Sequence, residues 1–400
     1  MSNRTRNLLS ILLIFLLAGS AFTAGFVAND FFELRSGGTL VRETETFDLF
    51  WEAWERVEGS YLGELPDERT LTYSAIRGAL TGLDDPYTVF VEPVAREQER
   101  QTLQGSYGGI GAALTRPEGR DEVVLEPIPG NPAEAAGIQS GDVLLAVDGE
   151  TITADLTVQA VAELIRGEKG TVVVLTVRHP GEDEPVDIAV ERTDILIPSV
   201  SARLLAEDET LGYIQLSRFS GESGGEIETA VSDLTAQGAT ALVLDLRGNG
   251  GGLVDAAVDV ADHFLREDTL ILTQISRDEG ERTFAATANT LAPDVPLVVL
   301  VDGGTASAAE ILAGALQDQA RALLVGSGPT FGKGSVQLVY DLSDGSSVHV
   351  TASRWFTPDG QQLDQQGLTP DLLVEVTPED IENGRDAVLN RAITYLQTGQ

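Results

Sequence analysis

The spacing of hydrophobic and polar residues changes from segment to segment along the 400-residue chain. The first segment is almost wholly apolar. Residues 8–27 read LLSILLIFLLAGSAFTAGFV and follow Arg4 and Arg6. As a helix, a run of this length spans about 30 Å, the thickness of the hydrocarbon layer of a membrane. We therefore predict a membrane anchor within residues 1–30. The small residues at 19–21 keep a cleaved signal peptide open as the alternative.

Both alternatives place the rest of the chain outside the cytoplasm, because a positive flank stays on the cytoplasmic side. We expect a protein of the bacterial cell envelope. It is anchored in the inner membrane with a periplasmic or cell-surface domain, or it is secreted if the signal is cleaved.

Residues 40–96 have a helical period. Apolar side chains recur on one helical face at Phe47, Phe50, Trp51, Trp54 and Val57. A second periodic stretch, 71–87, predicts a helix that ends near Gly82, because the sequence Asp84-Asp85-Pro86 favours a turn. We expect both helices to serve as packing elements.

Residues 97–192 change to short β-rich runs separated by turns. Strands are predicted at 123–128, 142–149 and 171–178, and a helix at 157–167.

From 193 to 376, predicted strands alternate with predicted helices, which indicates an α/β core with a mostly parallel sheet. A hairpin is predicted at 335–357. The last segment, 377–400, is predicted to be helical and either caps the core or contacts a second copy in a homodimer. The fold class is therefore a multidomain α/β protein.

Composition excludes several functions. A formal net charge of -37 argues against nucleic acid as a partner, because a polyanion is repelled. The absence of cysteine excludes a cysteine nucleophile and thiolate metal sites. With only three scattered histidines, we expect no metal and no other cofactor.

Two glycine-rich turns follow predicted parallel strands, DLRGNGGGL at 245–253 and VDGGTASAAE at 301–310. Reactive groups in such sheets gather at the carboxyl ends of the strands. Ser307 follows the second turn at the start of a helix, where amides and the positive helix end can stabilise an oxyanion. Ser307 is a candidate nucleophile. The spacing of Ser307 and Glu310 also fits a capping box, which is a structural role.

A serine nucleophile needs a base, and the three histidines lie in segments that do not present them to a site. The stretch TFGKGSVQ contains Lys333, and Lys169 is the only other lysine in the chain. A neutral amine can accept a proton, whereas arginine does not deprotonate in proteins.

The role requires a pKa lowered from about 10.4 to about 7 to 8, which burial can supply. No acidic residue lies between Asp318 and Asp341. We therefore expect no carboxylate near the amine of Lys333.

Gln337 is a candidate third member of the site. On one strand, residues 333, 335 and 337 share a face, and a neutral amide there can orient the amine. The alternative is a glutamine on an edge strand that faces solvent.

The stretches YGGIGAAL and GNPAEAAGIQSGDVLLAVDG make residues 97–192 resemble a PDZ domain. The resemblance implies that backbone amides of a glycine loop bind the carboxylate of a peptide C-terminus, while the peptide adds as a strand. The matching positions are Gly109, Ile110, Gly111 and Ala112.

Four stretches, DLRGNGGGL, VDGGTASAAEILAGAL, GPTFGKGSVQ and TPDGQQLDQQGLTPDLLVE, resemble in this order the carboxyl-terminal (tail-specific) processing peptidases. The resemblance runs from about Phe47 to the C-terminus and implies a crotonase-like α/β peptidase core. It implies Ser307 as nucleophile, Lys333 as general base and Gln337 as the orienting residue. It also implies an oxyanion hole from the amide of Ala308 and one amide of Gly250 or Gly251. Arg166 matches an arginine that links the PDZ domain to the core in some members, or it is a simple helix C-terminal charge.

The sequence thus predicts a serine endopeptidase that captures protein or peptide substrates by their apolar C-terminal tails. One alternative is a PDZ scaffold on a silent core, which the intact Ser307, Lys333 and Gln337 oppose. The other is enoyl-thioester chemistry in the cytoplasm, which the N-terminal apolar segment opposes.

Overall fold

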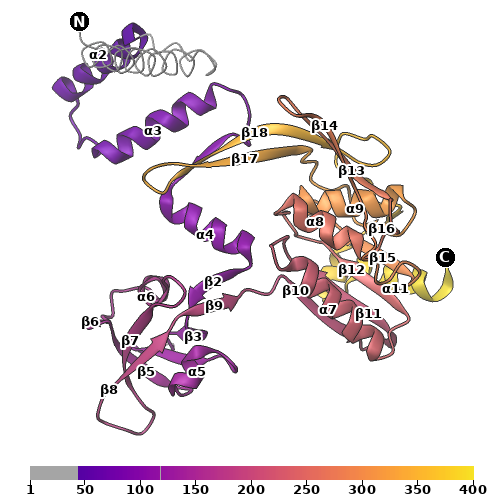
Figure 1. Cartoon of the computed structure of the whole chain (residues 1–400), viewed down its shortest axis with the longest axis horizontal. Coiled ribbons are helices and arrows are strands. Elements are labelled where there is room, and N and C mark those ends of the chain that lie inside the picture. The colour runs from indigo at the N-terminus through magenta and orange to yellow at the C-terminus, as the bar shows by residue number, and fades with distance from the viewer. Residues whose placement is uncertain (1–43, 118) are drawn as a thin grey trace, which may run out of the picture. The chain divides into compact units, whose positions relative to one another are not determined.

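The computed structural model describes residues 44–117 and 119–400 (Figure 1). The apolar run predicted to anchor the chain, residues 8–27, lies outside the described residues. Within the described ranges, no helix has both the length and the apolar character that crossing a membrane requires. The chain divides into two compact units with the boundary after Thr72.

The helices predicted between residues 40 and 96 are present as α2 (Thr44–Ser60) and α3 (Glu68–Thr81). On α2 the rings of Phe50 and Trp51 meet edge to face, with centroids 5.1 Å apart. The helix α4 (Pro93–Gln104) was not predicted, and the change of character expected at residue 97 falls inside it. Its sequence has no apolar stripe and none of its residues is buried, which explains why hydrophobic periodicity missed it.

A six-stranded sheet forms the centre of the α/β core, in the order β10-β11-β12-β15-β16-β19. From β11 onward each neighbour runs parallel, while β10 is antiparallel to β11. The predicted α/β core with a mostly parallel sheet is confirmed. The strands are β10 (Val200–Leu205), β11 (Asp208–Leu216), β12 (Ala241–Asp245), β15 (Leu297–Val301), β16 (Leu323–Gly326) and β19 (Leu372–Leu373).

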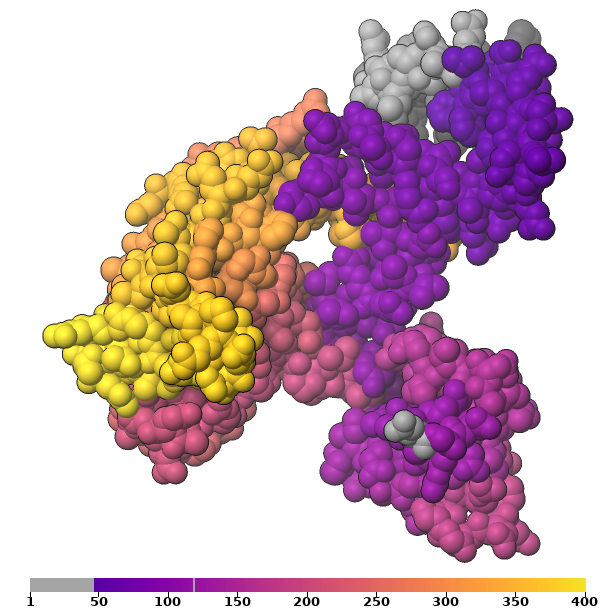
Figure 2. Space-filling view, turned by 180° about the vertical axis from the view of Figure 1, so that it is seen from behind, coloured from indigo at the N-terminus to yellow at the C-terminus, as the bar shows by residue number. Residues whose placement is uncertain are grey.

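Helices cover both faces of this sheet, because successive side chains of a strand point to opposite faces. On β12, Leu242 and Leu244 belong to the large buried cluster that includes side chains of three helices. Val243 packs on the other face against Val388 and Ala392 of the C-terminal helix. Figure 2 shows the C-terminal segment in yellow at the surface of the core. The helices are α7 (Ser223–Ala236), α8 (Val254–Asp262) and α9 (Ala308–Asp318) on one face and α11 (Ala387–Thr398) on the other, with the short α10 (Pro378–Glu382) before it.

A second, antiparallel sheet has the order β1-β18-β13-β14, and β17 also pairs with β18. The hairpin predicted at 335–357 is confirmed as β17 and β18, whereas the hairpin of β13 and β14 was not predicted. The sheet includes a strand from the N-terminal part of the chain, β1. The strands are β1 (Val89–Val91), β13 (Leu270–Ser276), β14 (Gly280–Ala285), β17 (Ser335–Asp341) and β18 (Ser347–Phe356).

The PDZ segment has its own buried cluster and a sheet of order β3-β4-β5-β7-β8, with β6 paired to β5. The strand β3 is an edge strand, and the pair β2 and β9 forms a separate two-stranded sheet. The elements are β2 (Ser106–Gly109), β3 (Ala112–Thr115), β4 (Val123–Pro127), α5 (Pro132–Ala136), β5 (Asp142–Val147), β6 (Glu150–Thr151), α6 (Val158–Ile165), β7 (Val172–Arg178), β8 (Val186–Glu191) and β9 (Thr193–Leu196).

Candidate active site

Three loops meet at one edge of the parallel sheet. The strands β12, β15 and β16 are parallel neighbours, so their carboxyl ends lie side by side. The glycine turn follows β12, the turn with Ser307 follows β15, and the loop with Lys333 follows β16. The topology therefore brings together the motifs that the sequence analysis singled out.

Ser307 has an unusual backbone. It is the N-cap of α9, with φ 57° and ψ −119°. Residues other than glycine rarely adopt a positive φ, and this conformation is strained. Two hydrogen bonds hold the turn that carries it: the Ala306 amide donates to the Asn249 carbonyl, and the Thr305 hydroxyl donates to the Leu246 carbonyl, each at 2.9 Å. The strained serine is thus fixed against the loop after β12.

Gly251 touches the serine turn so closely that only glycine fits. Its φ is +99°, and a Cβ added there would lie 2.8 Å from Cβ of Ser307 and 3.0 Å from the Ala308 amide nitrogen. The Gly251 amide already donates to Oδ1 of Asn249 at 2.9 Å. Among the described residues, the amides of Gly250 and Ala308 donate to no protein acceptor.

Glu310 joins the nucleophile turn to the lysine loop. Its side chain is fully buried and accepts four hydrogen bonds. The amides of Ser307 and Lys333 both donate to Oε2 at 2.9 Å. The Gly332 amide donates to Oε1 at 2.7 Å, and the Thr330 hydroxyl donates to the same oxygen at 2.5 Å. Glu310 occupies the capping-box position, and beyond capping it fixes the backbones of both candidate catalytic residues.

The Lys333 amine is partly buried and faces an aromatic ring. Burial lowers the pKa of Lys333, while the charges of Glu310 and Glu99 partly offset this by raising it. The expectation that no carboxylate lies near this lysine was wrong, because Glu310 comes from α9, a different part of the chain. Nζ lies 5.0 Å from the ring centroid of Tyr87. In the described part of the chain, Nζ has no hydrogen-bond or ion-pair partner, so no hydrogen bond joins it to Ser307.

The strand argument for Gln337 was wrong, although the residue does lie near the lysine in sequence. β17 begins at Ser335, after Lys333, and its pairing with β18 shifts between Val336 and Gln337. The extra residue of this shift lies on β18, so Ser335 and Gln337 still share a face, but the alternation does not extend back to Lys333. The Gln337 amide nitrogen donates to the hydroxyls of Ser335 at 3.0 Å and Thr351 at 3.2 Å.

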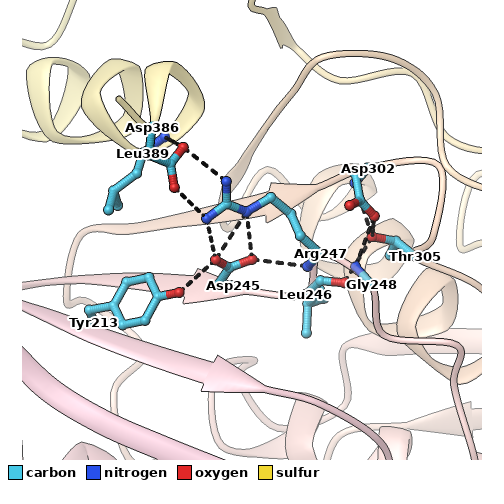
Figure 3. A network of polar contacts seen from close by, with 9 residues as sticks. All are labelled: Tyr213, Asp245, Leu246, Arg247, Gly248, Asp302, Thr305, Asp386 and Leu389. Atoms are coloured by element: carbon cyan, nitrogen blue, oxygen red, sulfur yellow. Dashed lines mark hydrogen bonds and ion pairs between the residues drawn. The ribbon is translucent and has the colours of Figure 1, made fainter. Parts of the chain in front are cut away.

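A polar network fixes the start of the glycine turn (Figure 3). Arg247 makes a bidentate contact with Asp386, at 2.9 Å and 2.8 Å, and also binds Asp245 at the end of β12. The Tyr213 hydroxyl donates to Asp245 at 2.7 Å, and burial followed by this bond raises the pKa of Tyr213 to about 12. Asp386 is also the N-cap of α11. The C-terminal helix is thereby tied to the loop that contacts Ser307.

Each of the three histidines lies beside a polar atom of another residue. His179 contacts Asp142 at 2.7 Å, His263 contacts the Gly224 carbonyl at 3.1 Å, and His349 lies 3.2 Å from Glu99.

In the PDZ segment, a cavity of about 210 Å³ lies between β3 and α6 and is lined by Gly109, Ile110, Gly111 and Ala112. Among the described residues, the amides of Ile110 and Gly111 donate to no protein acceptor. Arg166 also lines this cavity; its guanidinium lies 4.7 Å from the Tyr107 ring centroid and donates to Glu163 at 2.8 Å.

Sequence reasoning missed two residues of the site. Glu310 was identified only as a possible cap, although its position three residues after Ser307 was the available signal. Tyr87 follows the Asp84-Asp85-Pro86 turn, and nothing in the sequence around it indicates a contact with Lys333.

Comparisons with known proteins identify two parts of the chain. Residues 210–374 match peptidase family S41, and residues 123–179 match the PDZ domain. The chain is 40% identical over 349 residues to a chloroplastic C-terminal processing peptidase of Tetradesmus obliquus, covering 83% of this chain and 74% of that protein. It is 36% identical over 379 residues to a carboxyl-terminal-processing protease of a Synechocystis strain, covering 89% and 88%.

Among solved structures, a photosystem II D1 C-terminal processing protease aligns with a TM-score of 0.46 and 36% identity, covering 84% of this chain and 92% of that one. The chain is a serine-type endopeptidase that carries a PDZ domain. It belongs to the carboxyl-terminal processing peptidases of family S41.

Proposed function

We propose that this peptidase hydrolyses peptide bonds with Ser307 as nucleophile and Lys333 as general base. The observation that carries the proposal is the shared carboxylate of Glu310, which accepts hydrogen bonds from the amides of both residues. A buried acceptor common to two loops fixes their separation. The lowered pKa of Lys333, caused by burial, makes the neutral amine more available as a base.

In the proposed reaction, the neutral amine of Lys333 takes the proton from the Ser307 hydroxyl as Oγ attacks the scissile carbonyl. The protonated amine then gives this proton to the leaving nitrogen, and an acyl-enzyme remains on Oγ. Water attacks the ester with Lys333 again as base, and the second product leaves with a free carboxylate. Gln337 orients the amine through its side-chain carbonyl, which accepts no hydrogen bond among the described residues.

The oxyanion of each tetrahedral intermediate is held by backbone amides. The Ala308 amide lies directly after the nucleophile at the start of α9. Of the two glycines considered for the second donor, Gly251 already donates to Asn249, so we assign this role to Gly250. Gly251 instead provides the close approach that lets the two loops meet.

The PDZ segment is proposed to receive the C-terminal tail of the substrate. An edge strand, β3, can pair with an added peptide strand. The amides of Ile110 and Gly111 are left to bind the terminal carboxylate. The adjoining cavity is lined by Leu114, Val158 and Ile165, which suits an apolar last residue. Arg166 also lines this cavity, and we assign it the role of linking the PDZ segment to the core.

The action is proposed to take place in the cell envelope, with residues 8–27 as the anchor. The motivation is the length of this apolar run and its arginine flank. Membrane fractionation of cells that express the full chain tests the anchor: the protein should stay with the membrane after a high-salt wash. Release of a shortened chain into the soluble fraction would instead identify a cleaved signal.

The catalytic proposal is tested with one peptide that ends in an apolar residue and carries a free carboxylate, and with the same peptide amidated. Wild type should cleave the free acid faster, and Ser307→Ala should cleave neither. Equal cleavage of both peptides would contradict the role of the PDZ segment. Cleavage by Ser307→Ala at the wild-type rate would contradict the role of Ser307 as nucleophile.

A further inference from the structure

The amine of Lys333 rests on the face of a tyrosine. Nζ lies 5.0 Å from the centroid of the Tyr87 ring, within the range of a cation–π contact. In the described part of the chain, the amine has no hydrogen-bond or ion-pair partner that competes with this ring. The proposed base is therefore held by a ring and not by the hydroxyl of Ser307.

Tyr87 is held firmly in this position by the turn that carries it. Its amide donates to Oδ1 of Asp85 at 3.0 Å, and the Thr88 hydroxyl donates to the other oxygen of Asp85 at 2.6 Å. The Thr88 hydroxyl in turn accepts from the Thr351 amide in β18 at 3.1 Å. The Thr351 side chain also receives the hydrogen bond from Gln337. The turn after α3 is thus built into the wall of the candidate active site.

An aromatic face attracts a cation and has little attraction for a neutral amine, because the attraction comes from the ring quadrupole. We propose that Tyr87 is a positioning residue that retains Lys333 in its protonated, resting state, and that the amine turns to Ser307 once it has lost its proton to solvent. The inference rests on the proposed catalytic role of Lys333. It adds a residue from the N-terminal part of the chain to the control of the base.

Several charges face this pair from different elements. Glu310 on α9 and Glu99 on α4 raise the pKa of Lys333, against the larger lowering effect of burial. Asp85 in the turn and Asp364 in the loop after β18 act on Tyr87, whose pKa is raised by burial first and then by these charges and that of Glu310. A substitution at Tyr87 alters none of these four carboxylates, so it changes the ring alone.

The matched variants are Tyr87→Phe, which keeps the ring, and Tyr87→Leu, which keeps apolar cover but removes the aromatic face. The full chain contains only two lysines, so labelling with isotopic lysine gives NMR signals for Lys333 and Lys169 alone. Lys169, which is exposed and pairs with Asp194, is the internal reference.

In Tyr87→Leu, we expect a neutral fraction of Lys333 about three- to tenfold larger at pH values well below the midpoint of its titration. Tyr87→Phe should titrate like wild type. In Tyr87→Leu, the acid limb of the pH profile of kcat/KM should shift to lower pH by the same amount as the Lys333 titration. The Lys169 signal should not change.

An unchanged Lys333 titration in a folded Tyr87→Leu protein overturns the inference, as does an equal shift in Tyr87→Phe. The NMR titration does not depend on catalysis. If Ser307→Ala still cleaves peptide while the titration shifts as expected, the proposed function fails and the contact between ring and amine stands.

Discussion

The Glu310 carboxylate accepts a hydrogen bond from the backbone amide of Lys333 at 2.9 Å, and the same oxygen accepts one from the amide of Ser307 at 2.9 Å. One buried side chain therefore sets the relative position of two loops that follow neighbouring strands. The distance between nucleophile and base depends on this acceptor more than on contacts between their own side chains.

Glu310→Gln should damage both stability and catalysis. The NH2 of a glutamine would face the amides of Ser307 and Lys333 on one side, or the Gly332 amide on the other, so a backbone donor loses its acceptor whichever way the amide points. We expect the free energy of unfolding to fall by about 1 to 3 kcal/mol. The loops should also separate, and kcat should fall by about 10- to 100-fold.

The matched control is Glu226→Gln. Glu226 accepts three hydrogen bonds through one oxygen from the amide and hydroxyl of Ser199 and the amide of Val200, away from the candidate site. It should keep kcat and lose less stability than Glu310→Gln, because a glutamine can turn its carbonyl oxygen to all three donors. If denaturant unfolding shows equal losses and kcat is equal in both variants, Glu310 has only a structural role.

The pH dependence should follow the titration of Lys333. Because burial lowers the pKa of this lysine, kcat/KM should rise with pH along a limb centred below the value of about 10.4 for an ordinary lysine.

Stability gives an independent check of the same pKa. Between the folded and the unfolded pKa of Lys333, the unfolded chain binds more protons, so the free energy of unfolding rises as pH rises through this window. Lys333→Met removes the effect. Wild type should therefore gain stability relative to Lys333→Met as pH increases, in denaturant melts at a series of pH values. A difference that stays constant with pH would show that this lysine titrates normally.

Gly251→Ala should abolish most activity. The added Cβ would lie 2.8 Å from Cβ of Ser307, at a backbone φ of +99° that alanine adopts only with strain. The serine turn must shift, and we expect kcat/KM to fall about 100-fold or more. Gly303→Ala is the control, because Gly303 has no atom within 4 Å of an added Cβ. Near-wild-type activity of Gly251→Ala in a steady-state assay would argue against close contact of the two loops during catalysis.

Asp386→Asn tests whether the C-terminal helix supports the active site. Asparagine remains a good N-cap for α11 but loses the ionic contact with Arg247 (Figure 3). We expect a loss of about 1 kcal/mol in unfolding free energy, since Asp386 is partly exposed, and a fall of roughly three- to tenfold in kcat.

Asp380→Asn is the control for this test. Asp380 also pairs with an arginine, Arg385, next to a helix start, but it has no contact with the glycine turn. Loss of kcat in both variants, measured beside thermal unfolding, would mean that the coupling is not specific to the Arg247 network.

Both glycine-rich turns were predicted to follow parallel strands, and they follow β12 and β15. Ser307 was paired with Lys333 because a serine nucleophile needs a base that can lose its proton, and because of the family resemblance; this pairing stays a prediction. The contact of Glu310 with the Lys333 loop could not be predicted, because it depends on how α9 packs against a loop. The relation of Gln337 to Lys333 was misjudged because β17 begins only at Ser335, so the period of two does not reach Lys333.

Some elements were invisible to periodicity. The helix α4 is polar on every side and buries none of its residues, so it lacks the apolar stripe on which helix prediction depends. Tyr87 reaches Lys333 only because β1 pairs with β18 and carries the preceding turn to the site. Long-range pairing of this kind leaves no trace in a single sequence.

The most direct test of the central claim is the rate at which a fluorophosphonate probe reacts with Ser307 as a function of pH, followed by intact-protein mass spectrometry. In wild type, the rate should rise with the neutral fraction of Lys333. Lys333→Arg should remain unlabelled even though the charge is kept, while Lys169→Arg should label like wild type. Labelling of Lys333→Arg at the wild-type rate would contradict the account, because Ser307 would then be activated without an amine that can lose its proton.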